Sequence, residues 1–224
     1  MALQDIINTA TNIEINRSKL VAQNVSRSGR LSVASRNWAN PFRFTITPKP
    51  VWTAAEYRSV FEPIFTADRY STQVIELTDH NGSGVITATG MAWLTAYQGG
   101  LDSAGDGTLD NYTATSMTGT SLTLTKSGSP TVGTYIFKAG DYLRISGGSY
   151  PYIVSSDVQV SASATAVVTT HRGRLQTFSS GTPVFVGQRA AVFNVVVTKL
   201  PQIRFLPGQL VEFTSDFELI EEIL

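Results

Sequence analysis

Residues 36–70 read RNWANPFRFTITPKPVWTAAEYRSVFEPIFTADRY and place a strand directly before a helix. In the expected strand, 42–47, the apolar residues Phe42, Phe44 and Ile46 alternate with polar ones. A period of two with one apolar face is the pattern of a half-buried strand. The stretch therefore predicts a sheet with one buried face, followed at once by an element that can cover such a face.

The helix is predicted to begin at Thr53, because Thr53 and Glu56 have the T-x-x-E spacing of a capping box. Trp52 and Tyr57 stand at the two positions of a hydrophobic staple around this start. Pro63 lies inside the helix, so we expect a kink or an early end there. One apolar stripe with the i, i+3, i+4, i+7, i+8 pattern runs along the helix and consists of Tyr57, Val60, Phe61, Ile64 and Phe65.

Composition narrows the class of protein. The 224 residues are enough for one large domain or two small ones with their own cores. Seventeen basic residues balance seventeen acidic ones, and this balance does not favour nucleic acid as the main partner. The chain has no cysteine, which excludes disulfides, thiolate zinc sites and a cysteine nucleophile.

No segment predicts secretion or membrane insertion. The N-terminus has no basic region ahead of an apolar core. The uncharged stretch 81–101 is interrupted by glycine and threonine, so it lacks the sustained apolar run that a bilayer requires. We expect a soluble protein.

Most of the chain outside the helix consists of short alternating runs separated by turn residues, which predicts a mainly β protein. After the helix we expect strands at Val74–Thr78, Val85–Thr89 and Met91–Tyr97. The glycine- and aspartate-rich stretch 99–111 is interpreted as a flexible junction. Its aspartates are spaced by four, unlike the alternating carboxylates of a calcium loop.

From residue 112 to residue 198 the sequence is a Ser/Thr/Gly-rich series of short strands, which suggests a small barrel or sandwich. If exposed, the aromatic residues of this region would form a groove for stacking sugars; if buried, they form a core. These residues are Tyr112, Tyr135, Phe137, Tyr142, Tyr150 and Tyr152.

The two ends of the chain carry opposite charge. Residues 17–36 contain five basic residues and no acid, whereas 209–224 contain five acids and no base. The basic cluster is interpreted as a solvated or subunit-facing strand edge rather than a nucleic-acid site, because it lacks aromatic stacking platforms. We expect the two ends to share one sheet or to face each other across a subunit boundary. The candidates for a subunit interface are Arg27, Arg36, Trp38, Arg43, Asp216 and Glu218.

Motifs for catalysis or cofactor binding are not found. His80 and His171 lack the H-x-x-x-H spacing of a metal site, and there is no G-x-S-x-G elbow for a nucleophilic serine. The glycines at 99–107 precede no predicted helix and carry no Lys-Ser/Thr pair that would cradle phosphate. We therefore expect no enzyme activity, no metal and no cofactor.

The order of these segments resembles a known family. SRNWANPFRFTITPKP is followed by the capped helix, VIELTDH, an insert containing IFKAGDYLRISGGSYPYIVSSDV, and a return strand at the C-terminus. This order is similar to that of the distal tail proteins of long-tailed bacteriophages, in the subgroup with a small oligonucleotide/oligosaccharide-binding (OB)-type barrel. The resemblance covers most of the chain. It implies a β-sandwich belt domain with one α-helix (1–82 and 199–224) and an inserted OB-like β-barrel domain (83–198).

The resemblance also implies a function. Such a protein is a structural subunit of the virion, made in the host cytoplasm and located at the tail tip. It forms a homo-hexameric ring that connects the tail tube to the baseplate or hub. Its partners are the tail tube protein, the hub and fibre-bearing proteins, and DNA passes through the lumen without specific binding. Two alternatives stay open, namely a glycan-binding module that contacts the host surface and a tube-forming tail protein.

Overall fold

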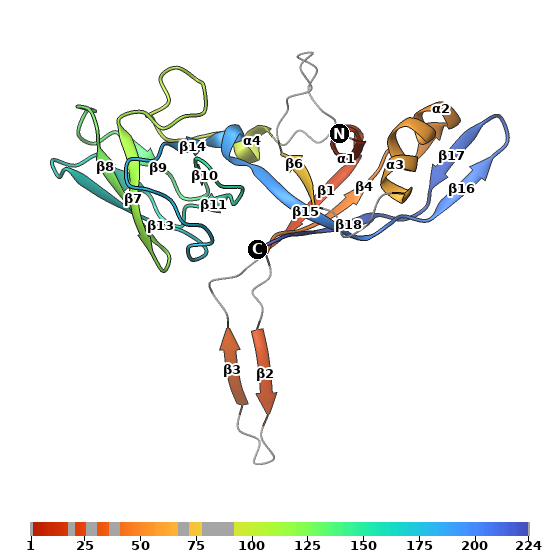
Figure 1. Cartoon of the computed structure of the whole chain (residues 1–224), viewed down its shortest axis with the longest axis horizontal. Coiled ribbons are helices and arrows are strands. Elements are labelled where there is room, and N and C mark those ends of the chain that lie inside the picture. The colour runs from red at the N-terminus through yellow and green to blue at the C-terminus, as the bar shows by residue number, and fades with distance from the viewer. Residues whose placement is uncertain are drawn as a thin grey trace.

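A computed structural model of the chain describes residues 2–17, 21–25, 31–35, 41–66, 72–77 and 92–223. Within these ranges the protein is mainly β, with several small antiparallel sheets and short helices (Figure 1). The prediction of a mainly β chain is therefore confirmed. The expected strand Val85–Thr89 and the residue His80 lie outside the described ranges.

A five-stranded antiparallel sheet joins both ends of the chain. Its strand order is β1-β4-β18-β15-β6. The predicted strand at 42–47 is confirmed as β4, and its pairing with β18 brings N-terminal and C-terminal segments into one sheet, whereas the described strands of the basic stretch 17–36 do not belong to that sheet. The bounds are β1 (Asn12–Asn16), β4 (Arg43–Thr47), β6 (Gln73–Glu76), β15 (Val192–Lys199) and β18 (Phe217–Glu221).

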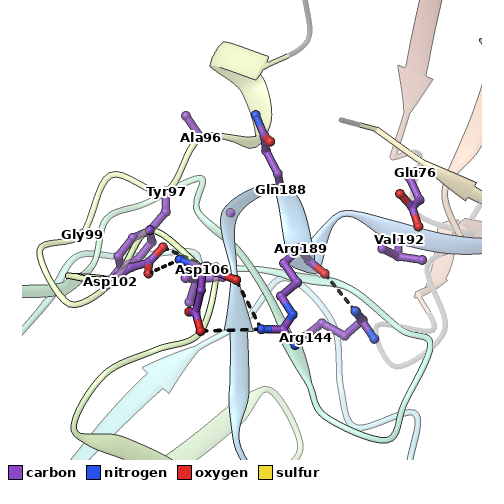
Figure 2. A pocket seen from close by; sticks show the side chains of 14 residues that line it. Glu76, Ala96, Tyr97, Gly99, Asp102, Asp106, Arg144, Gln188, Arg189 and Val192 are labelled. Atoms are coloured by element: carbon purple, nitrogen blue, oxygen red, sulfur yellow. Dashed lines mark hydrogen bonds and ion pairs between the residues drawn. The ribbon is translucent and has the colours of Figure 1, made fainter. Parts of the chain in front are cut away.

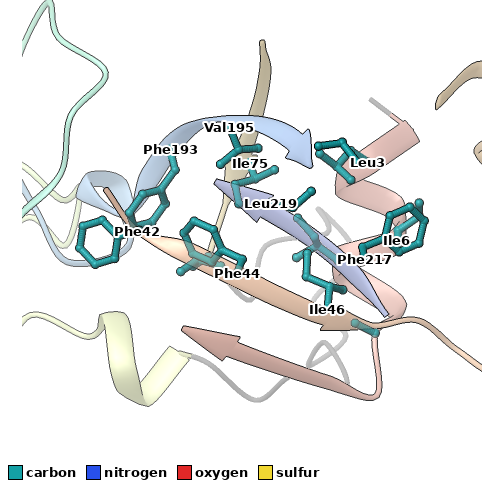
Figure 3. Close-up of a cluster of buried hydrophobic side chains, with 14 of the residues drawn as sticks. Leu3, Ile6, Phe42, Phe44, Ile46, Ile75, Phe193, Val195, Phe217 and Leu219 are labelled. Atoms are coloured by element: carbon teal, nitrogen blue, oxygen red, sulfur yellow. The ribbon is translucent and has the colours of Figure 1, made fainter. Parts of the chain in front are cut away.

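One face of this sheet forms the larger core. Phe42, Phe44 and Ile46 are fully buried there, as their alternation predicts. Helix α1 (Ala2–Thr9), which was not predicted, lays its apolar side chains Leu3 and Ile6 on the same face (Figure 3). The sheet is therefore a layer with one packed side, which we call its inner face.

The predicted helix is present and begins with the predicted capping box. Thr53 N–H donates to Glu56 Oε2 at 2.8 Å, and Glu56 N–H donates to Thr53 Oγ1 at 3.3 Å. The predicted early end is wrong, because the segment continues through Pro63 to Thr66. Its irregularity is a π-helical turn before the proline, where the Glu62 N–H donates to the Tyr57 carbonyl five residues back. The helical pieces are α2 (Ala54–Glu56), the π-turn η1 (Tyr57–Phe61) and α3 (Glu62–Thr66).

A three-stranded sheet supports this helical segment. It has the order β16-β17-β5 and comprises β5 (Val51–Thr53), β16 (Ile203–Leu206) and β17 (Leu210–Phe213). The ring of Phe61 packs against Trp52 of β5 and Phe213 of β17, with centroids 4.8 and 4.2 Å away. All three side chains belong to the larger core, so the helical segment is anchored where the sequence predicted.

A two-stranded hairpin stands apart from these layers. It consists of β2 (Val21–Val25) and β3 (Leu31–Ser35), which pair only with each other among the described residues. In the chain it lies between β1 and β4, which are themselves neighbours in the five-stranded sheet. Figure 1 shows it projecting away from the other described elements. We call β2–β3 the arm.

Eight further strands surround a second core. They form the sheets β13-β8-β7, β11-β10-β14 and β12-β9 around buried residues such as Leu122, Ile136 and Val184. We call β7–β14 the insert. The bounds are β7 (Tyr112–Thr118), β8 (Ser121–Lys126), β9 (Tyr135–Phe137), β10 (Tyr142–Ile145), β11 (Tyr152–Ile153), β12 (Val158–Gln159), β13 (Thr165–Thr169) and β14 (Val184–Val186).

The connections into and out of the insert differ from expectation. The predicted strand Met91–Tyr97 is wrong, since Ala92–Thr95 forms the short helix α4. Periodicity cannot distinguish a strand from a helix in so short an apolar run. At the other end, the 3-10 helix η2 (Gly187–Ala190) leads from the insert into β15. The expected domain boundary at 198/199 therefore falls at the end of β15, a strand that pairs with β18 and β6.

Candidate functional site: the outer sheet face and the junction with the insert

The second face of the five-stranded sheet carries no buried side chain in the described strands. Burial alternates along β4, β15 and β18, so every second residue of these strands points away from the core. Glu14 pairs with Thr45, which pairs with Glu218, and the three side chains form a row across β1, β4 and β18. We call this second face of the five-stranded sheet the outer face.

Acids outnumber bases on the outer face. Lys199 pairs with Glu218 at 2.8 Å in an exposed ion pair, and the burial alternation of β4 leaves Arg43 exposed on the same side. The ionisable residues of this face in the described strands, with the adjoining residue 222, are Glu14, Glu76, Glu218, Glu222, Arg43 and Lys199. The face therefore carries a modest excess of carboxylates, and it also presents the apolar side chains of Val74, Val192, Val196 and Ile220.

The outer face brings together two of the six interface candidates. Arg43 and Glu218 both lie on it, on the neighbouring strands β4 and β18. Asp216 precedes β18 and instead borders a shallow pocket with Pro48 and Pro50. The other three candidates, Arg27, Arg36 and Trp38, have no described side chains. That these residues form a subunit interface stays a prediction.

A buried ion pair lies where the insert meets the sheet. Arg172 Nη1 and Nη2 donate to the two carboxylate oxygens of Glu221 at 2.5 and 2.7 Å, and both side chains are fully buried. Arg172 Nη2 also donates to the carbonyl of Pro151 at 2.6 Å. Glu221 Oε2 accepts the Phe42 N–H at 3.1 Å. Glu221, one of the five acids at 209–224, is thus buried within the chain rather than exposed to solvent or to another subunit.

The strand pattern contained a signal for this burial. Phe217, Leu219 and Glu221 stand at every second position of β18, so the carboxylate lies on the same face as two core residues. No comparable local signal marks Arg172, which follows β13 after a short bend. Its partner is 49 positions away in the sequence.

His171 is part of the same junction. Its Nδ1 accepts the Ile153 N–H at 2.9 Å, and its ring lies 5.3 Å from that of Phe42. Its Nε2 is buried without a hydrogen-bond partner. Burial and the nearby charges of Arg172 and Arg17 lower the pKa of His171 to about 3. The imidazole is therefore neutral at physiological pH and acts as a hydrogen-bond acceptor.

A cleft between the segment 96–107 and η2 contains a separate polar cluster (Figure 2). Arg189 Nη1 donates to the Asp106 carbonyl at 3.2 Å, and Arg144 Nη2 donates to the Arg189 carbonyl at 2.9 Å. The Asp102 carboxylate accepts the N–H groups of Asp106 and Gly107, both at 3.1 Å. These groups largely satisfy one another, and the described residues contain no cluster of His, Asp and Glu that could hold a metal ion.

Four of the six aromatic residues considered for a sugar groove are buried, three in the core of the insert and Tyr142 in the larger core. Tyr112, Phe137, Tyr142 and Tyr152 are buried, whereas Tyr135 and Tyr150 are partly exposed. Four buried rings cannot serve as a stacking platform for sugars, so this finding counts against the groove considered above.

No protein-family model matches the chain, and no curated protein sequence matches it. Among the described residues, no helix has the length and apolarity needed to cross a membrane. The function is therefore argued from the sheet, the arm and the junction themselves.

Proposed function

We propose that the chain is a structural virion protein of a phage tail tip, a distal tail protein that forms a homo-hexameric ring between the tail tube and the baseplate or hub. The observation that carries this proposal is the sheet with one packed face and one open face on which carboxylates outnumber cations. In the ring, the outer face lines the central passage. Glu14 and Glu76 supply its negative charge.

The charge of this face suits a passage for DNA. Proteins that bind DNA do so largely by neutralising phosphates with Lys and Arg, and that binding would retain the genome. On the outer face, Lys199 is already paired with Glu218. A lining with an excess of carboxylates repels phosphates, so the DNA slides past without specific binding.

The arm supports assembly with further copies. A two-stranded hairpin alone in water is marginally stable at best, and its open edges favour pairing with another chain. In the described part of the chain β2–β3 has no third strand. Contact between the arm of one copy and a different surface of the next is heterologous. Contacts of this kind close into rings when the rotation between copies allows it.

The pairing of the insert supports a barrel of the OB type. A bridge between Ala114 and Thr182 links β7 to the segment before β14, and a bridge between Val154 and Thr170 links the ends of β11 and β13. The three-stranded sheets β13-β8-β7 and β11-β10-β14 are thereby joined at both ends. We further propose that the remaining strands, β15 included, form the sandwich-like belt domain that builds the ring.

The assembly state tests the ring directly in solution. Light scattering after size exclusion should give about six times the chain mass of 24.2 kDa. Deleting residues 21–35, which removes both arm strands, should reduce the mass to that of one chain while the circular dichroism of the remaining sheets is kept. A single-chain mass for the intact protein would overturn the proposal, and a mass that grows without limit would favour the tube-forming alternative.

The role of the outer face has its own test. The double variant Glu14→Lys/Glu218→Lys should still form the assembly, because both side chains point away from the core. It should retain duplex DNA at low salt, whereas the parent does not, since charge-driven binding weakens as salt rises. Equal DNA retention by parent and variant would contradict a passage lined by this face.

A further inference from the structure

Three segments that are distant in the sequence meet around the buried ion pair. Arg172 comes from the insert, Glu221 ends β18, and Phe42 precedes β4. The guanidinium of Arg172 lies over the rings of Phe42 and Tyr152, 5.1 and 5.5 Å from their centroids. The pair therefore sits between the two cores and contacts both of them.

Separating the buried ion pair is unfavourable. A buried charge is tolerated only while it is paired and hydrogen-bonded, because the apolar surroundings cannot solvate it. Both side chains are fully buried, and the Glu221 carboxylate also accepts the Phe42 N–H. Moving the insert away from the sheet would leave Arg172 and Glu221 without each other until water entered. The pair therefore opposes displacement of the insert from the sheet.

The junction also adjoins two residues that flank the arm in the chain, Arg17 and Phe42, which we call the root of the arm. The chain enters the arm after Arg17 and returns to the sheet through Phe42. Phe42 touches the pair and His171, and Arg17 is close enough to His171 for its charge to act on the imidazole. Arg17 and Phe42, which flank the arm in the chain, thus both lie beside the place where the insert docks.

We propose that the Arg172–Glu221 pair is a latch that fixes the orientation of the insert relative to the five-stranded sheet and the root of the arm. The latch is a property of one chain and holds whether or not copies assemble. While the pair is closed, the insert and the five-stranded sheet move together, because the pair contacts both cores.

Distances between spin labels test the latch. The chain has no native cysteine, so Arg58→Cys on the helical segment and Ala162→Cys on the insert place labels at two exposed positions. Labelled chains are diluted into unlabelled protein, so that only distances within one chain are recorded. The parent should give one narrow distance distribution. Arg172→Met should broaden it at least twofold in width.

A matched control distinguishes the effect of losing the buried pair from the effect of losing an exposed ion pair. Lys199→Met likewise removes a cation that pairs with a carboxylate, here Glu218, but at an exposed site on the sheet. This variant should keep the narrow distribution of the parent. An equally broad distribution for Lys199→Met would overturn the assignment to the buried pair.

A milder variant covers the case in which Arg172→Met does not fold. Arg172→Lys keeps the positive charge but cannot form the two-pronged contact with the carboxylate. It should fold, as judged by circular dichroism, and should also broaden the distribution. A folded Arg172 variant whose distribution has the width and mean of the parent would show that the pair does not set the orientation, and the proposal would fail.

Discussion

The ring of Phe61 lies 4.2 Å from the ring of Phe213, measured between centroids, and this contact ties the helical segment to β17. Phe61 is fully buried, and the ring of Phe217 lies 6.0 Å from it and 6.4 Å from that of Phe213. The helical segment thus closes one end of the larger core.

Phe61→Ala should leave a cavity in this core and lower the free energy of unfolding by about 3–5 kcal/mol. Chemical denaturation monitored by circular dichroism measures the loss. Phe205→Ala is the matched control, because Phe205 is 71% exposed on β16 and its truncation opens no cavity. A loss well under 1 kcal/mol for Phe61→Ala would show that the assigned buried face is wrong.

Glu221→Ala should lower the free energy of unfolding far more than Glu218→Ala, the same change three positions earlier. It leaves the Arg172 guanidinium buried without its carboxylate, which costs about 3–5 kcal/mol. Glu218→Ala removes only an exposed pair with Lys199, worth at most about 1 kcal/mol. Thermal and denaturant unfolding of both variants measure the difference. Equal losses would argue that Glu221 is solvated.

The junction should make stability depend on pH through His171. Its pKa is about 3 in the folded protein against an ordinary value of 6.5, so the unfolded chain binds the proton more readily between these values. Stability should therefore fall as the pH drops below 6.5. The loss from this group is on the order of 2 kcal/mol by pH 5.

His171→Asn isolates this contribution, because the asparagine Oδ1 can still accept the Ile153 N–H but does not titrate in this range. Unfolding free energies of parent and variant, measured from pH 7.5 to pH 5, should diverge as the pH falls, with the parent losing more. Parallel curves would mean that the imidazole is already protonated, or is free to be protonated, in the folded protein.

The turn at 138–141 depends on one buried carboxylate. Asp141 Oδ2 accepts the Lys138 N–H at 2.8 Å and Oδ1 accepts the Gln98 N–H at 2.9 Å, while burial raises the pKa of Asp141. Asp141→Ala leaves both donors without this acceptor and should cost about 2–4 kcal/mol. Asp157→Ala is the control, since Asp157 accepts one exposed N–H, from Ala139, and its loss should stay below about 1 kcal/mol. Similar losses for the two variants would contradict the role of Asp141.

The parts of the fold that the sequence predicted are those with contiguous signals. Alternation from Phe42 to Thr47 and the Thr53–Glu56 cap are each contained in a few neighbouring residues, and both are present in the structure. Helix α1 was missed although Leu3, Ile6, Ile7 and Ala10 have helical spacing and are all buried. The helical pattern of apolar residues was present in the sequence, but it covered only a short segment.

The candidate site was less predictable. Arg43 and Glu218 were selected for their charge, and strand pairing places them on one face. The Arg172–Glu221 pair could not be found, because no local pattern shows which loop of the insert reaches the end of β18. Burial of a charge depends on the partner that tertiary structure supplies, and here that partner lies 49 positions away.

Electron microscopy of the purified protein tests the central claim most directly. We expect closed rings of six subunits around a central hole, with the outer face of the five-stranded sheet towards the hole. Particles of single chains, or tubes without a closed end, would contradict it.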